Sequence, residues 1–217
     1  MFFVMLGFVG IALLAPSGSP LHLAQGSMWM QTSRTIGIAM AQYANDHGGN
    51  YPDGKSSTEV FQKLLDGNYV TDPGIFYVPY TGKVKAGLGE PLKPENVSWD
   101  VTEGVDSLSS DEIPIVFLTG YRVTYAAGGP AVSLVKPYPD FGDPPRTWIQ
   151  WWRGEPKPMQ RSIPGIAVTY KGGESAYKMF MFESTPAPEG TMTDFVSSKF
   201  DPKGRIYHQL TPTESLP

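Results

Sequence analysis

The sequence predicts an α+β protein in which a long N-terminal helix, first apolar and then amphipathic, packs on a small antiparallel sheet with long loops. The first charged residue is Arg34, so the leading segment lacks formal charge. Residues 24–46 then place apolar or small side chains at spacings of three and four, which is typical of a helix. After residue 69, short runs of β-branched and aromatic residues indicate strands. This order, helices first and strands second, favours α+β.

The composition indicates an ordered domain rich in loops. The chain has 217 residues, which suits one domain with an appendage, and it combines 24 Gly and 21 Pro with 41% hydrophobic residues. The net charge is −4 and the 17 Lys and Arg residues are scattered, whereas a nucleic-acid-binding protein normally has a basic stripe. We therefore expect no nucleic-acid partner. The absence of cysteine excludes disulfides, thiolate zinc sites and cysteine nucleophiles.

Residues 1–23 are predicted to form the membrane-anchor half of the first helix. Residues 1–16 contain no charged or strongly polar side chain, and each large apolar side chain left in water would cost roughly 1.5–3 kcal/mol. As a helix they would span only about 24 Å, which is short for a hydrocarbon core of about 30 Å. A cleaved secretory signal ending at the small-x-small site 24–26 and a buried core element therefore remain alternatives. The residues expected in membrane insertion and assembly are Phe3, Leu6, Phe8, Ile11, Leu14 and Pro16.

Residues 24–217 are predicted to form a soluble α+β domain that begins with two helices. In the first helix, 24–46, we expect Trp29, Ile36, Met40 and Tyr43 to pack on the sheet. The turn-forming residues 46–50 and the following Tyr-Pro pair end this helix. The second helix, 57–66, has the capping-box pattern of Ser56 and Glu59 and ends at Gly67. Its predicted buried face consists of Val60, Phe61, Leu64 and Leu65.

The strands are expected mainly within residues 74–183. The β-rich runs are 74–79, 113–126, 165–171 and 177–183. The last two runs are predicted to form a hairpin that turns at residues 172–175. The intervening segments 80–112 and 127–164 contain many Pro and Gly and are expected to be long loops.

A motif in the first helix and its turn resembles a known family. The pattern R-x-I-G-x-A-x-x-x-Y-A-x-D-x-x-G-x-Y-P, after an apolar helix, is similar to that of bacterial type IV pilin-like proteins and type II secretion pseudopilins. The resemblance covers about residues 1–80. The motif positions are Arg34, Ile36, Gly37, Ala39, Tyr43, Ala44, Asp46, Gly49, Tyr51 and Pro52.

The resemblance implies a non-enzymatic subunit with a pilin-like fold. Such a protein is a single-pass component of the bacterial inner membrane, with its soluble domain in the periplasm or in an extracellular filament. Its apolar helix would assemble with other pilin-like subunits, identical or different, and it would have no small-molecule substrate. One departure is that the family's processing site, Gly-Phe-x-x-x-Glu, is missing. If Pro16 is the family's helix-kinking proline, that glutamate would fall about two residues before Met1, so we expect the anchor to begin upstream.

The sequence offers no pattern for catalysis. The three histidines, His22, His47 and His208, have no metal-ligand spacing, and neither a G-x-S-x-G nor a phosphate-binding loop occurs. We therefore expect no catalytic residue and no cofactor-binding residue.

An acidic segment is the candidate for a metal site. Asp100, Asp106 and Asp111 lie close together in sequence and carry the hard oxygens that calcium prefers. The spacing does not match a known calcium loop, so the favoured interpretation is a solvated acidic loop without an ion.

A tryptophan cluster carries the alternative hypothesis about function. Trp148, Trp151 and Trp152 lie between Arg146 and Arg153, a composition that suits either a core-anchoring loop or a surface for a glycan or protein partner. Combined with a cleaved N-terminal signal, such a surface would make the chain an exported carbohydrate- or protein-binding module.

Overall fold

The computed structural model describes residues 20–79, 82–123, 125, 132–134, 165–179, 191–192, 202–213 and 215–216. Several of the predicted functional residues therefore lie outside the described residues. They are the anchor set Phe3, Leu6, Phe8, Ile11, Leu14 and Pro16, and the tryptophans Trp148, Trp151 and Trp152.

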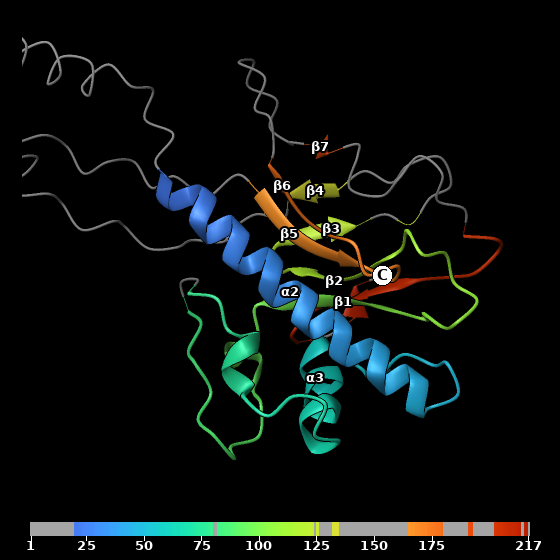
Figure 1. The fold of residues 1–217 in the computed structure, drawn as a ribbon, viewed down its shortest axis with the longest axis horizontal. Coiled ribbons are helices and arrows are strands. Elements are labelled where there is room, and N and C mark those ends of the chain that lie inside the picture. The colour runs from blue at the N-terminus through green and yellow to red at the C-terminus, as the bar shows by residue number, and fades with distance from the viewer. Residues whose placement is uncertain are drawn as a thin grey trace, which may run out of the picture.

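The first described element, α2, runs along one face of the main sheet (Figure 1). It spans Pro20–Asp46, so it begins four residues before the predicted start at 24, with a proline in its first turn, where the missing N–H costs nothing. It ends where the turn was predicted. Gly48 and Gly49 have φ angles of 66° and 91°, and the Gly49 N–H donates to the Ala44 carbonyl at 2.7 Å.

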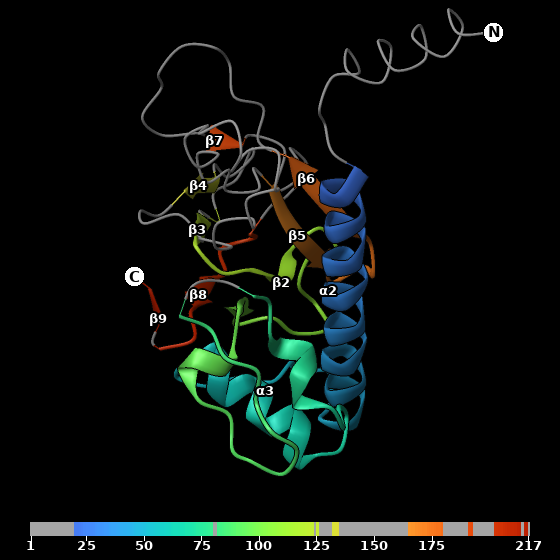
Figure 2. The ribbon, with the colours of Figure 1, turned by 90° about the vertical axis from the view of Figure 1, so that its left-hand side faces the viewer.

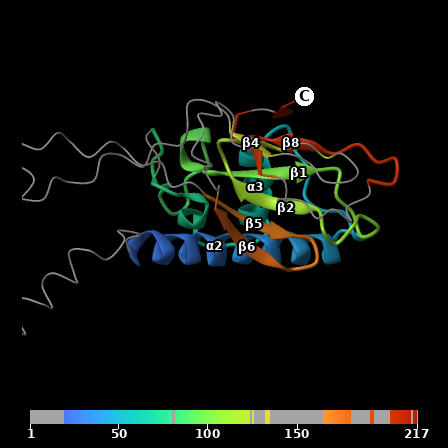
Figure 3. The same ribbon diagram turned by 90° about the horizontal axis from the view of Figure 1, so that it is seen from above.

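The sheets are antiparallel throughout, which confirms the α+β class. The main sheet has the order β6-β5-β2-β1-β8-β9, and a second sheet has the order β3-β4-β7. Figures 2 and 3 show α2 beside β5 and β6, at one side of the molecule. The main-sheet strands are Trp99–Glu103 (β1), Pro114–Leu118 (β2), Gly165–Tyr170 (β5), Ser175–Met179 (β6), His208–Leu210 (β8) and Ser215–Leu216 (β9). The second sheet contains Tyr121–Val123 (β3), Val132–Leu134 (β4) and Thr191–Met192 (β7).

The prediction of a strand at 74–79 is wrong. A 3-10 helix, η1, occupies Pro73–Phe76, and the Asp72 side chain caps it by accepting the Gly74 N–H at 2.8 Å. Phe76 and Val78 are nevertheless buried. The apolar composition of this segment therefore reflects burial in the core and not strand pairing.

The predicted run 113–126 contains two strands that belong to different sheets. Gly120, with a φ angle of 95°, separates β2 from β3. The segment 80–112, predicted as a loop, contains η2 (Pro94–Asn96) and the central strand β1. The predicted loop 127–164 contains β4, and strands β7, β8 and β9 lie beyond the predicted limit at residue 183. These strands are short and mix polar with apolar residues, so their composition resembles that of a loop.

The predicted hairpin is confirmed. Strand β5 pairs with β6 from Gly165↔Met179 to Thr169↔Ser175, and the turn contains Gly173 with a φ angle of 85°. Ser175, which was predicted in the turn, already pairs within β6. The end of the predicted strand, 180–183, lies outside the described residues.

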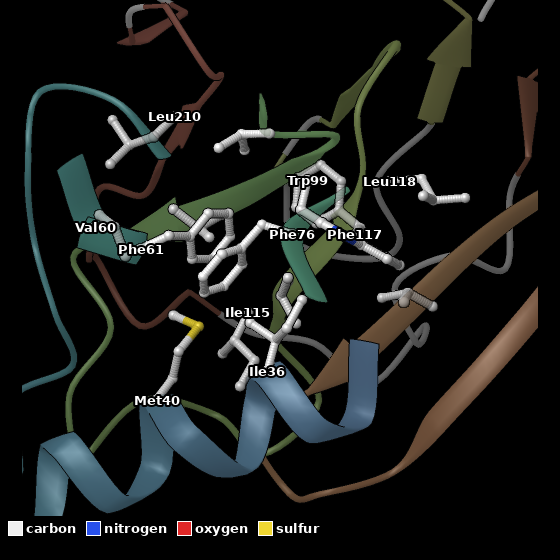
Figure 4. Packing of buried hydrophobic residues seen from close by; sticks show 14 of the residues in the cluster. Ile36, Met40, Val60, Phe61, Phe76, Trp99, Ile115, Phe117, Leu118 and Leu210 are labelled. Atoms are coloured by element: carbon white, nitrogen blue, oxygen red, sulfur yellow. The ribbon is translucent and has the colours of Figure 1, made fainter. Parts of the chain in front are cut away.

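The core lies between the main sheet, α2 and the second helix, α3 (Figure 4). Ile36 and Met40 of α2 face Phe61 of α3 and Phe76, whose rings stack with centroids 4.5 Å apart. The helix α3 spans Ser57–Asp66, as predicted. Ser56 Oγ accepts the Glu59 N–H at 3.3 Å, but Glu59 Oε2 accepts the Lys55 N–H at 2.9 Å in place of the Ser56 N–H. One half of the capping box is therefore regular, and in the other half Glu59 binds the backbone N–H one residue before the N-cap.

Candidate functional site

The sheet-facing side of α2 carries most of the predicted packing residues. Trp29, Ile36 and Met40 are all buried in the core. Gly37 marks a close approach of helix and sheet, because a Cβ there would lie 2.6 Å from Thr169 Cγ2. The glycine at this motif position thus lets α2 lie directly on β5.

Hydroxyl groups join α2 to the hairpin at the same place. Thr169 Oγ1 donates to Ser33 Oγ at 2.9 Å and lies 2.9 Å from Ser175 Oγ. Ser33 Oγ in turn donates to the Met30 carbonyl. The hydrogen bond between Thr169 and Ser33 is buried and forms only when the helix is docked, so it favours a single position of the helix on the sheet.

Tyr43, the fourth predicted packing residue, is only half-buried and belongs to an aromatic group. Its ring stacks on His47 with centroids 3.8 Å apart and meets Tyr69 edge-on at 5.4 Å. The Tyr69 hydroxyl donates to Asp46 Oδ2 at 2.8 Å, and this hydrogen bond raises the pKa of Tyr69. His47 Nδ1 lies 2.8 Å from the Tyr43 carbonyl. This group holds the end of α2 against the segment that follows α3.

The last motif positions tie the turn after α2 to the loop after β1. A Cβ on Gly49 would lie 2.8 Å from Ser107 Oγ, and the Tyr51 N–H donates to the Val105 carbonyl at 3.2 Å. Asn50 forms an antiparallel bridge with Asp106. The motif residues from Ile36 onward therefore form the contact between α2 and the sheet and the turn that follows α2.

The solvent side of α2 is low in charge. Met28 and Ile38 are 55% and 51% exposed, and Arg34, the first motif position, is also exposed. None of the helices in the described part of the chain is long and apolar enough to cross a membrane.

The acidic segment is not one solvated loop. Asp100, predicted to be solvated, is a buried residue of the central strand β1, so this prediction was wrong. Its neighbour Val101 lies level with Val116 and Thr169, and Thr169 contacts α2, so the Asp100 side chain points to the opposite face of the sheet. Its Oδ2 accepts a hydrogen bond from Gln209 Nε2 at 2.7 Å. Desolvation raises the pKa of Asp100 to about 7, although Gln209, Thr119 and Lys83 lower it in part.

The other two calcium candidates each face a cation of the protein itself. Asp106 forms an ion pair with Arg205, whose hydrogen bond holds the pKa of Asp106 below its ordinary value. Asp111 Oδ1 lies 3.0 Å from Lys171 Nζ. Among the residues that the structure describes, no three His, Asp or Glu side chains form a group that could hold a metal ion.

Lys171 occupies a cradle of oxygens in the loop after β1. Its ammonium group donates to the carbonyls of Ser107 at 3.2 Å and Ser109 at 2.7 Å, in addition to Asp111. Two carbonyls and a carboxylate are oxygens of the kind that a hard cation prefers. Lys171, which follows β5 in the hairpin, thus places its positive charge among these oxygens and orders the loop. Sequence reasoning missed Lys171 because it lies 60 residues or more from its partners.

A pocket of about 390 Å³ lies where α3 ends. Asp66 and Glu90 are among its lining residues, and Asp66 accepts a 2.7 Å hydrogen bond from Gln62.

Comparison with protein-family models, with curated proteins and with solved structures gives no match.

Proposed function

We propose that this chain is a non-enzymatic, membrane-anchored pilin-like or pseudopilin-like subunit of a bacterial secretion or pilus-like system. In this proposal residues 1–16 insert into the membrane and join other subunits, and α2 links them to the α+β domain. The domain lies in the periplasm or in an extracellular filament.

The observation that supports this proposal best is the docking of α2 on the antiparallel sheet through the motif residues. Gly37 allows contact with Thr169, and Gly49 allows the turn to contact Ser107. A helix fixed in this way provides a rigid connection between an apolar leading segment and the sheet domain. The low charge on the exposed side of α2 is compatible with close packing of neighbouring subunits.

Membrane fractionation tests the anchor. We expect the full-length chain to remain with membranes after a high-salt wash and to dissolve only in detergent, because its apolar residues lie in lipid. A variant without residues 1–16 should leave the membrane. Ile206→Asp, which changes an exposed apolar residue elsewhere, is the matched control and should fractionate like the unaltered chain. A full-length chain that is monomeric and soluble without detergent contradicts the proposal.

N-terminal sequencing of the mature protein separates the proposal from the exported binding module. Retention of residues 1–16 supports the anchored subunit. A mature chain that begins near Ser27 supports a cleaved signal instead.

Assembly can be tested by cross-linking, since the natural chain has no cysteine. Leu14→Cys places one thiol in the proposed assembly segment, and Glu174→Cys places one on the exposed hairpin turn. Oxidation in membranes should link subunits through position 14 much more than through position 174. Equal or absent cross-linking at position 14 contradicts packing of neighbouring anchors.

A further inference from the structure

A buried carboxyl group lies on the sheet face that points away from α2. Asp100 is in β1, between β2 and β8, and is 1% exposed. Its Oδ2 accepts the hydrogen bond from Gln209, whereas its Oδ1 is buried with no hydrogen-bond partner among the described residues. A buried charge without full hydrogen bonding is strongly unfavourable, so this environment penalises the ionised carboxylate.

Gln209 connects this carboxyl group to the second sheet. Its Nε2 donates to Asp100 at 2.7 Å, and its Oε1 accepts the Val123 N–H at 2.9 Å. Val123 is the last residue of β3, and both it and Gln209 are buried. One side-chain amide therefore bridges the two sheets through both its donor and its acceptor.

A second contact beside the first also reaches the segment after β3. The Thr102 hydroxyl lies 2.6 Å from the Tyr125 hydroxyl and also donates to the Pro114 carbonyl. Thr102 and Asp100 lie on the same side of β1, two residues apart. Residue 123 is thus held to β8 and residue 125 to β1, its neighbour in the main sheet.

The charged and titratable groups around Asp100 offset its burial only in part. Lys83 attracts the carboxylate, but its ammonium group donates to the Pro94 carbonyl at 2.8 Å and does not bond to Asp100. Tyr125 is neutral in the physiological pH range. On β2 the residue paired with Asp100 is the uncharged Phe117.

We infer that Asp100 and Gln209 form a pH-sensitive latch between the two sheets, closed while the Asp100 carboxyl is protonated and loosened when it ionises. In the closed state Gln209 holds Val123 of β3 against the main sheet. Ionisation creates a charge that water can solvate only if the cover over β1 opens locally. Opening therefore becomes more frequent when Asp100 loses its proton.

The direction and range of the effect follow from the pKa values of the two states. Burial raises the pKa of Asp100 to about 7 in the closed state, whereas a solvated aspartate has a pKa of about 3.9. The open state therefore releases the proton at lower pH. Its population should rise by up to about tenfold per pH unit between about pH 4 and pH 7, and then become constant.

Two measurements on the full-length chain test the latch. The first is hydrogen exchange of the Val123 amide from pH 4.5 to 8, corrected for the intrinsic exchange rate. We expect its protection to fall at least tenfold between pH 5 and pH 7 and to level off above. The second is the carbon-13 shift of the Asp100 carboxyl group, which should titrate over the same range.

Variants separate the latch from a general loss of stability. Asp100→Asn removes the titration and should make Val123 protection independent of pH. Asp111→Asn changes an exposed carboxylate and should leave the pH profile unchanged. If Asp100 titrates near pH 4, or if Val123 protection is constant with pH in the natural chain, the latch is wrong. Because both results come from the unaltered protein, a variant that fails to fold does not prevent the test.

Discussion

Gly37 of α2 and Thr169 of β5 lie so close together that a Cβ on Gly37 would be 2.6 Å from Thr169 Cγ2. The threonine cannot easily rotate away, because its hydroxyl is held by Ser33 and Ser175. The helix therefore rests on the sheet through backbone at this point. The contact explains why glycine is present in the interior of a helix, where it is otherwise unfavourable.

Gly37→Ala should destabilise the protein. Overpacking typically costs about 1–3 kcal/mol, and better helix propensity returns about 1 kcal/mol or less. We expect a net loss of about 1–2 kcal/mol in the free energy of unfolding, measured by urea denaturation. Combining the change with Thr169→Ser, which removes Cγ2 but keeps the hydroxyl, should restore part of the loss. If Gly37→Ala is as stable as the natural chain, the close approach does not limit the fold.

Asp100→Asn should increase the free energy of unfolding more at high pH than at low pH. The pKa of Asp100 is raised to about 7 in the folded state, so the natural chain loses stability as the pH rises from about 4 to about 7. The asparagine variant lacks this loss and should be the more stable protein at pH 8, with less or no advantage at pH 4. Thermal unfolding at both pH values measures this. Parallel pH profiles for the two proteins would contradict it.

Lys171→Met should loosen the loop after β1. The methionine keeps much of the apolar stem but removes the ammonium group from the cradle formed by Ser107, Ser109 and Asp111. Hydrogen bonds to charged groups contribute about 1.5–3 kcal/mol when buried, and partial exposure here reduces this to about 1–2 kcal/mol. The Gly172 N–H, which donates to the Asp111 carbonyl at 2.8 Å, should exchange faster.

Lys55→Met is the matched control for this change, because Lys55 is exposed and far from the loop in sequence. It should leave both the stability and the exchange of Gly172 unchanged. Equal effects of the two substitutions would show that the cradle does not order the loop.

Ser56→Ala should destabilise α3 through its first turn. The Ser56 hydroxyl accepts the Glu59 N–H, and loss of an N-cap costs about 1 kcal/mol. Ser56→Thr keeps the hydroxyl and should retain most of the stability. Urea denaturation of the three proteins provides the comparison, and a fully stable alanine variant would indicate that Glu59 and Lys55 suffice to begin the helix.

Local sequence signals determined the helices and the hairpin. The cap at Ser56, the apolar spacing within 57–66 and the glycine turn near residue 173 are interactions between near neighbours, so their chemistry is readable along the chain. The same holds for the end of α2 and for the burial of Trp29, Ile36 and Met40. A helical period predicts which side of a helix is buried whatever covers it.

Only the tertiary structure decided the pairing of the strands and the environment of the charges. β1 combines Asp100 and Thr102 with apolar residues, and it becomes a central strand because β2 and β8 supply its hydrogen bonds. Segment 74–79 has the composition of a strand, yet Asp72 and Pro73 begin a 3-10 helix there. The hydrogen bonds of Asp100 to Gln209 and of Lys171 to Asp111 join residues that are 60 or more positions apart in sequence. Composition reports how well a segment tolerates burial, whereas pairing and pKa depend on which distant groups the fold brings together.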